Sequence, residues 1–89
     1  MPHYIYILKC ADNTLYTGYA TDPIRRLDEH NNSPKGAKYT RVRRPCELVY
    51  TEEFETRSEA TKREAAIKKL TRSQKDELIK GYRGMNKND

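Results

Sequence analysis

Arg26 and His30 are four residues apart in a segment that is predicted to be helical, so both side chains project from one face. A guanidinium and an imidazole side by side repel each other when both are charged, but they coexist well around a phosphate, which arginine binds in a bidentate manner. The pair therefore suits the recognition of a phosphate group. The alternative is an exposed arginine and a histidine that belongs to the capping region of the helix.

A carboxylate falls on the apolar side of a second predicted helix, over residues 57–70. The apolar face of that helix is made by Ala60, Ala66, Ile67 and Leu70. Glu64 stands four residues after Ala60 and three before Ile67, so helical spacing places it on the inward-facing stripe. Burying a carboxylate is costly unless it is paired or bound to a metal ion. Glu64 is therefore either a metal ligand or an edge residue that pairs with Lys68 at the i+4 position.

Tyrosine outnumbers phenylalanine by seven to one, and two of the tyrosines lie on paired strands of a predicted hairpin over residues 4–20. A loop of two residues, 12–13, would place Tyr6 and Tyr16 on opposite faces of the hairpin. A loop of three residues, 12–14, would place both on one face, together with Leu8 and Gly18. A site shared by the two phenols requires this second register or a bulge with the same effect.

The basic residues are concentrated in one segment, residues 35–44, which holds five cations and no acid. That excess equals the formal net charge of the whole chain, +5. Its cations and its tyrosine are Lys35, Lys38, Tyr39, Arg41, Arg43 and Arg44. Cations with an interleaved aromatic ring suit phosphate contact plus base stacking. The alternative is a solvated loop that keeps the protein soluble.

The elements that must position these residues follow from local signals. Strands are expected over residues 4–10, 15–20 and 47–54, and helices over 23–31, 57–70 and 73–80. Asp22 before Pro23 is an N-cap, and Thr56 with Glu59 has the form of a capping box. Gly81 is the expected C-cap of the last helix. The prediction is an α+β domain over residues 1–82, followed by a disordered tail over 83–89.

The order β-β-α-β-α-α favours a three-stranded antiparallel sheet flanked by helices. A chain of 89 residues builds one small core with one site at its edge. No apolar run approaches a membrane span, and the N-terminus lacks the pattern of a signal peptide. Cys10 and Cys46 have no CxxC partner, which favours free thiols in a reducing compartment. The expected location is the cytoplasm.

The ordered set of these residues resembles the GIY-YIG nuclease domain. The first motif reads Tyr4-Ile5-Tyr6, and the second reads Tyr16-Thr17-Gly18, ten residues further on. Arg26 follows eight residues after the second motif, then come His30 and, after the third strand, Glu64. The resemblance covers roughly residues 3–70, and it points to the small stand-alone bacterial GIY-YIG proteins.

This resemblance implies a metal-dependent nuclease that hydrolyses phosphodiester bonds of nucleic acid, with DNA as the expected substrate and repair or recombination as the expected setting. Glu64 would hold a single Mg²⁺ or Mn²⁺ ion, and Arg26 would clamp the phosphate. Tyr6 would activate the water, while Tyr16 and His30 orient water and phosphate and Gly18 supports the motif. Specificity would come from the basic segment or from a protein partner, or the protein would have none.

Two other classes of function stay open. Many members of the family carry an asparagine shortly after the glutamate, and here no asparagine lies between Asn32 and Asn86. That departure favours a catalytically weak or inactive module that binds nucleic acid with the same fold. The second alternative is a basic protein that binds the ribosome or acidic partners.

Overall fold

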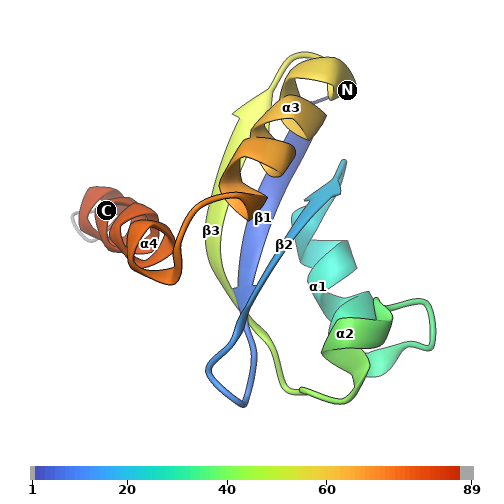
Figure 1. Ribbon diagram of the computed structural model, residues 1–89. Helices are drawn as coiled ribbons and strands as arrows, with labels where there is room; N and C mark the ends of the chain where they lie inside the picture. The colour runs from blue at the N-terminus through green and yellow to red at the C-terminus, as the bar shows by residue number, and fades with distance from the viewer. Residues whose placement is uncertain (1, 87–89) are drawn as a thin grey trace.

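The computed structural model describes residues 2–86, and residues 83–86 in their backbone alone. Its elements are β1 (His3–Lys9), β2 (Leu15–Ala20), α1 (Pro23–Asn32), α2 (Lys38–Arg41), β3 (Glu47–Phe54), α3 (Arg57–Lys68) and α4 (Arg72–Asn86) (Figure 1). The strands form one antiparallel sheet in the order β2-β1-β3. The predicted α+β class and the order β-β-α-β-α-α are confirmed. One short helix, α2, was not predicted and lies inside the basic segment.

The central strand β1 is buried on both faces, because helices cover both sides of the sheet (Figure 1). Ile5 and Ile7 face α3 and α4, where they pack with Ala60, Ile67 and Ile79. The alternate residues of the strand belong to the other face, which is covered by α1 and α2. The buried residues of that second cluster are Tyr6, Leu8, Cys10, Ala20 and Cys46. Strand alternation thus divides the protein into two cores.

The hairpin register differs from both predicted loops. Lys9 pairs with Leu15, so five residues, 10–14, connect the strands. The loop closes through a hydrogen bond from the Cys10 amide to the Thr14 carbonyl oxygen, and Asn13 adopts a left-handed backbone with φ of 69°. The longer loop shifts the register by two residues, which preserves the side on which each residue lies. Tyr6 and Tyr16 therefore share a face, as the three-residue loop predicted.

The predicted helix starts are confirmed at two sites. The Asp22 carboxylate accepts a hydrogen bond from the Arg25 amide at 3.1 Å, with Pro23 in the first turn. The Thr56 hydroxyl accepts one from the Glu59 amide at 3.2 Å. Each cap satisfies an amide that has no partner within its helix.

The predicted end of the last helix is wrong. α4 continues through Gly81 to Asn86, and Gly81 does not take the left-handed conformation of a C-cap. Residues 83–86 of the predicted tail form the last turn of this helix, and residues 87–89 lie outside the described residues. The predicted apolar face of α3 is also partly wrong, because Ala66 is exposed whereas Ala60 and Ile67 are fully buried.

Candidate active site

The position of the Tyr6 ring depends on Gly18, its partner across the β1–β2 ladder. A Cβ atom at residue 18 would lie 2.5 Å from the Tyr6 Oη atom, far inside van der Waals contact. The absence of a side chain at Gly18 therefore lets the Tyr6 ring lie across the edge strand β2. Tyr16 lies on the same face, with its ring centroid 6.4 Å from that of Tyr6.

Two side chains of α1 hold the Tyr6 hydroxyl. The oxygen lies 2.8 Å from His30 Nε2, and the Arg26 guanidinium lies near enough to affect its titration. Burial raises the pKa of Tyr6 to about 12, while the nearby Arg26 guanidinium acts against that rise. Burial and the charge of Arg26 lower the pKa of His30 to about 4. At pH 7 the phenol is therefore protonated and the imidazole is neutral.

His30 is fully buried, and the basic segment fixes its orientation. Its Nδ1 atom lies 2.8 Å from the Thr40 hydroxyl and 3.3 Å from the Ala37 amide, so both ring nitrogens have polar partners. A Cβ atom at Gly36 would lie 2.7 Å from the Glu29 carbonyl oxygen, so glycine lets this segment approach α1 closely. The sequence pattern missed Thr40, because the segment was described by its charge. The one signal for it was a small hydroxyl residue among cations.

Glu64 reaches the site from α3, on the opposite face of the sheet. Its negative charge contributes to the raised pKa of Tyr6, so the carboxylate lies within electrostatic range of that hydroxyl. The side chain of Glu64 is 20% exposed and pairs with Lys68 Nζ at 3.0 Å. The i+4 spacing on α3 thus brings Lys68 to Glu64, as one of the two alternatives from the sequence expected, whereas a metal ligand was expected to lack such a partner.

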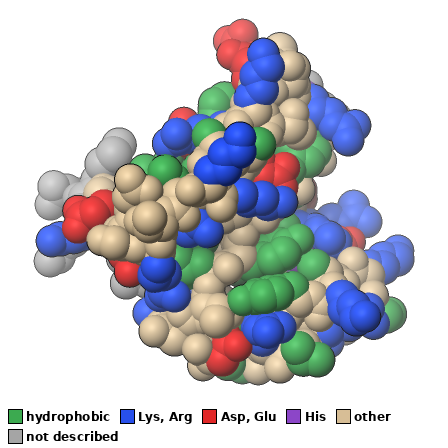
Figure 2. Space-filling view, in the orientation of Figure 1, with side chains coloured by type: hydrophobic (Ala, Val, Ile, Leu, Met, Phe, Trp, Pro, Cys, Tyr) green, Lys and Arg blue, Asp and Glu red, His purple; other side chains and the backbone are tan. Residues whose placement is uncertain are grey.

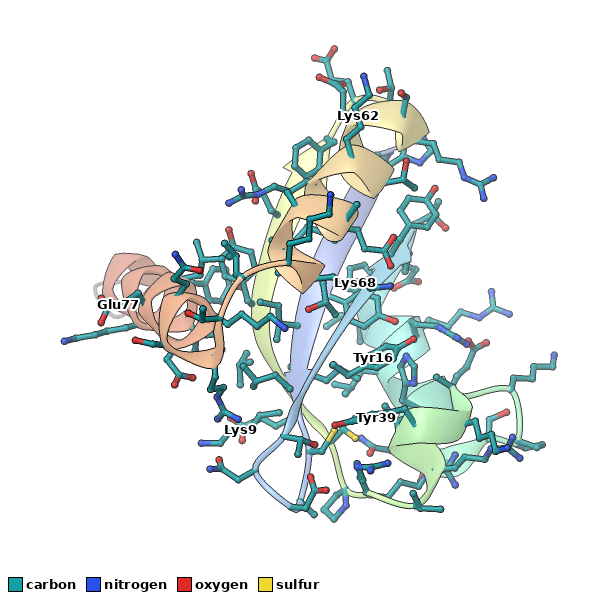
Figure 3. The ribbon with its side chains drawn as sticks, viewed as in Figure 1. Lys9, Tyr16, Tyr39, Lys62, Lys68 and Glu77 are labelled. Carbon is teal, nitrogen blue, oxygen red and sulfur yellow. The ribbon has the colours of Figure 1, made fainter. Side chains whose placement is uncertain are left out.

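An aromatic strip, formed by the half-buried Tyr16 and the exposed Tyr39, connects this network to the basic segment. Figure 2 shows hydrophobic surface in the hollow between α3 and α2, and Figure 3 places Tyr16 and Tyr39 there in the same view. The two rings stack with centroids 5.9 Å apart. The centroid of the Tyr16 ring also lies 5.2 Å from that of the His30 ring, in an edge-on arrangement. The Arg43 guanidinium lies 3.9 Å from the Tyr39 ring centroid. Aromatic surface therefore extends from the buried histidine to the solvent.

The cations of the basic segment fall into two groups. Arg43 is held by the Asp12 carboxylate at 3.0 Å and by the Tyr39 carbonyl oxygen at 2.9 Å. Arg44 donates to carbonyl oxygens at the end of α1, those of His30 and Ser33 among them. The outward-pointing members are Lys35, Lys38 and Arg41, all exposed. Of the five predicted phosphate contacts, these three are the cations whose charge is directed to solvent.

Tyr6, Tyr16, Arg26, His30 and Glu64 follow one another along the chain and converge in space. The model of the GIY-YIG catalytic domain matches residues 2–77. This chain belongs to the GIY-YIG family. A GIY-YIG domain implies the nuclease class of hydrolase and a nucleic acid as substrate, in agreement with the resemblance noted in the sequence.

Similar GIY-YIG proteins of about the same length occur in bacteria. The UPF0213 protein of Enterococcus faecalis (strain ATCC 700802 / V583) is 60% identical over 90% of this chain and 92% of its own. The solution structure of the E. faecalis protein EF2693 is similar, with a TM-score of 0.63 and 58% identity over 92% of this chain and 86% of that one. The UPF0213 protein BH0048 of Bacillus halodurans has a TM-score of 0.58 and 49% identity over 90% and 84%. These names assign no specific activity.

GIY-YIG nucleases generally use a divalent metal ion. Within residues 2–86, no three side chains of His, Cys, Asp or Glu are grouped closely enough to hold a metal by themselves. Glu64 supplies one carboxylate. Mg²⁺ commonly binds through one or two carboxylates together with water and substrate phosphate. The residues therefore fit an ion that is held jointly by Glu64 and the substrate.

No helix within residues 2–86 combines the length and the apolar character that crossing a bilayer requires.

Proposed function

We propose that this GIY-YIG protein is a metal-dependent endonuclease that hydrolyses phosphodiester bonds of DNA, in repair or recombination. The family match supports the reaction class. The observation that carries the proposal is the Tyr6 hydroxyl, held between His30 and Arg26 with Glu64 in electrostatic range. Its proposed location is the cytoplasm, where free thiols such as those of Cys10 and Cys46 stay reduced.

Arg26 is the residue that would bind the scissile phosphate. Its Nη1 atom now donates to Glu29 Oε1 and to the Lys35 carbonyl oxygen, both at 2.9 Å. These contacts orient the guanidinium beside Tyr6, and its remaining N–H groups are available to a phosphate oxygen. Because the transition state carries more charge on those oxygens, Arg26 stabilises it more than the ground state.

Tyr6 and His30 would handle the proton of the attacking water. In the free protein, the gap between a phenol pKa of about 12 and an imidazole pKa of about 4 makes transfer between them cost on the order of 10 kcal/mol. Tyr6 therefore stays protonated until positive charge arrives nearby and cancels the effect of Glu64. A divalent ion would supply that charge and stabilise the leaving oxygen. In the tautomer whose Nδ1–H donates to the Thr40 hydroxyl, His30 Nε2 is free to accept the phenolic proton while Tyr6 takes one from water.

The second candidate function is a module that binds nucleic acid without cleaving it. The pairing of Glu64 with Lys68 favours this alternative, because it gives the carboxylate a structural partner in the free protein. The absence of asparagine between residues 32 and 86 points the same way. In that case the outward-pointing cations and the Tyr16–Tyr39 strip would still bind DNA.

The experiment that separates the two functions is a cleavage assay on purified protein with Mg²⁺. The substrates are supercoiled plasmid, branched duplex and single-stranded DNA, each with an EDTA control. Wild-type protein should nick at least one of them, and Glu64→Gln should lose at least about 100-fold in rate. Lys62→Gln is the matched control on the same helix and should keep the wild-type rate. DNA binding without cleavage of any substrate would reject the nuclease and favour the binding module.

A further inference from the structure

The Glu64–Lys68 pair on α3 is asymmetric. Its N–O distance is 3.0 Å, yet the Lys68 side chain is 55% exposed whereas Glu64 is 20% exposed. The carboxylate is thus sheltered beside the proposed site, while the ammonium stands at the end of a flexible and solvated chain. Exposed pairs of this i,i+4 type are weak, so Lys68 can leave Glu64 with little cost to the fold.

The stability of α3 rests on other contacts. Ala60 and Ile67 anchor the helix in the apolar core, and the Thr56 hydroxyl caps its start. Another cation of the helix, Arg63, pairs with Glu52 of β3 at 3.0 Å. The stability of α3 therefore does not depend on the ion pair between Lys68 and Glu64.

Lys68 also points in a distinctive direction. In Figure 3 it extends from α3 toward Tyr16, whereas Lys62 stands at the far end of the same helix. The Tyr16 ring is 6.4 Å from the Tyr6 ring, and the Tyr6 hydroxyl lies within range of the Glu64 charge. The ammonium of Lys68 is thus paired with the same Glu64 carboxylate that the proposed metal ion would bind.

We propose that Lys68 is an exchangeable counter-ion of the metal ligand: it neutralises Glu64 in the free protein, is displaced by the divalent cation, and then binds the phosphate backbone of the substrate. This proposal rests on the proposed function. A carboxylate cannot serve both cations fully, so the ion must compete with the ammonium. Once released, Lys68 is a free positive charge beside an anionic substrate, and the nearest new partner is a phosphate oxygen.

The exchange predicts two opposite effects of one substitution. Lys68→Met removes the competitor, so divalent cations should bind more tightly to the DNA-free protein. The same change removes one phosphate contact, so DNA should bind more weakly, but only when a divalent cation has released the lysine. A lysine that merely stabilises α3 would produce neither effect.

The first test measures Mn²⁺ binding to DNA-free protein from the loss of the free-ion signal in electron paramagnetic resonance. Lys68→Met should raise Mn²⁺ affinity about three- to tenfold, as expected for loss of one nearby positive charge. Lys62→Met, the matched control, should leave it unchanged, and Glu64→Gln should abolish it. Equal Mn²⁺ affinity in Lys68→Met and wild type, or no binding by either protein, would overturn the exchange.

The second test measures DNA affinity against salt, with Ca²⁺ present and with EDTA. In Ca²⁺, Lys68→Met should reduce the slope of log K against log salt by about 0.9, the value for one phosphate contact on duplex DNA. In EDTA the slope should equal that of wild type. The same slope change in both conditions would show that Lys68 binds phosphate without exchange, and an unchanged slope in Ca²⁺ would show that it binds none; either result rejects the proposal.

These results are separable from the fate of the proposed nuclease. A protein that shows the Lys68-dependent Mn²⁺ and DNA effects but cleaves no substrate would keep the exchange and reject the nuclease. A protein that cleaves DNA but shows neither effect would keep the nuclease and reject the exchange.

Discussion

The two faces of the sheet are built on one strand but differ in chemistry. On the side of α3 and α4, β1 contributes Ile5 and Ile7 to an apolar core. On the side of α1 and α2, it contributes Tyr6, whose hydroxyl is bound to a fully buried His30. Neighbouring residues of β1 therefore belong to different faces. One face stabilises the fold by burying apolar side chains, whereas the other keeps titratable groups out of water.

The polar face lowers the stability of the fold, because it buries the titratable side chains of Tyr6 and His30. Burying a phenol and an imidazole displaces the pKa of each away from neutrality, to about 12 and about 4. Apolar side chains in those positions would carry no such penalty. We infer that burial on the apolar face offsets the free energy lost on the polar face. Glu64 links the two faces, because it belongs to α3 and its charge acts on Tyr6.

The largest effect is expected on the apolar face. Ile67→Ala removes a fully buried side chain of α3 and should cost about 3 kcal/mol of unfolding free energy, because a cavity remains. Urea unfolding followed by circular dichroism measures this. Ala66→Ser, at an exposed neighbouring position, is the control and should change stability by less than about 0.5 kcal/mol. Equal effects of the two substitutions would contradict the burial of Ile67 in the apolar core.

The next effect compares two glycines. Gly18→Ala places a methyl group against the Tyr6 hydroxyl and should cost about 2 kcal/mol, with cleavage reduced at least about tenfold. Gly81→Ala is the matched control inside α4, where the new Cβ meets no atom within 4 Å. It should raise stability by about 0.5–1 kcal/mol, because alanine is the better helix former. Thermal melts that rank the pair in the reverse order would reject the close approach of Tyr6 to β2.

The polar face should also be sensitive to acid. The folded-state pKa of His30, about 4, lies below its ordinary value of 6.5, so the unfolded chain binds a proton in that interval and the folded chain does not. Stability should be fully present above pH 6.5 and fall by about 2–3 kcal/mol as pH approaches 4. Urea midpoints between pH 7 and pH 4 measure the loss. His30→Gln should lack this part of it, and an equal loss in both proteins would contradict the assignment.

The smallest effect concerns the surface cations. Changing Lys35, Lys38 and Arg41 together to glutamine should reduce the salt slope of DNA binding by about 2–3, one phosphate contact each. Arg44→Gln should leave the slope unchanged and instead cost about 1 kcal/mol of stability, because α1 loses the donor at its last carbonyl groups. Binding at several salt concentrations, with a melt of each variant, tests this. A slope change in Arg44→Gln would mean that its contacts to α1 give way to phosphate.

Local signals in the sequence were enough to predict most of the fold. The helix starts at Asp22–Pro23 and at Thr56 could be predicted because each cap depends on hydrogen bonds between residues close in sequence. Gly81 misled the prediction, because a glycine at a helix end and one inside a helix look alike until packing decides. The hairpin loop was predicted too short, since its closure by Cys10 and Thr14 leaves no mark in residue types.

The candidate site could be predicted in its residues but not in its connections. The sequence left two hairpin registers open, and the loop that forms places Tyr6 and Tyr16 on one face. The i+4 rule already offered Lys68 as a partner for Glu64. The contact of Thr40 with His30 could not be read from the sequence, because it depends on how the basic segment folds back onto α1. The same fold assigns Arg44 to the end of α1, a use of a cation that charge patterning does not distinguish from phosphate binding.

The central claim is that the polar face is a catalytic site, and Tyr6→Phe tests it most directly. The substitution removes one oxygen atom, the one that lies 2.8 Å from His30 Nε2, and keeps the ring that fills the core. Cleavage rates with Mg²⁺ should be measured well below the melting temperature, beside DNA affinity in Ca²⁺. The account predicts a loss of at least about 100-fold in rate with affinity unchanged within about twofold. A Tyr6→Phe protein that cleaves within about threefold of the wild-type rate would contradict it.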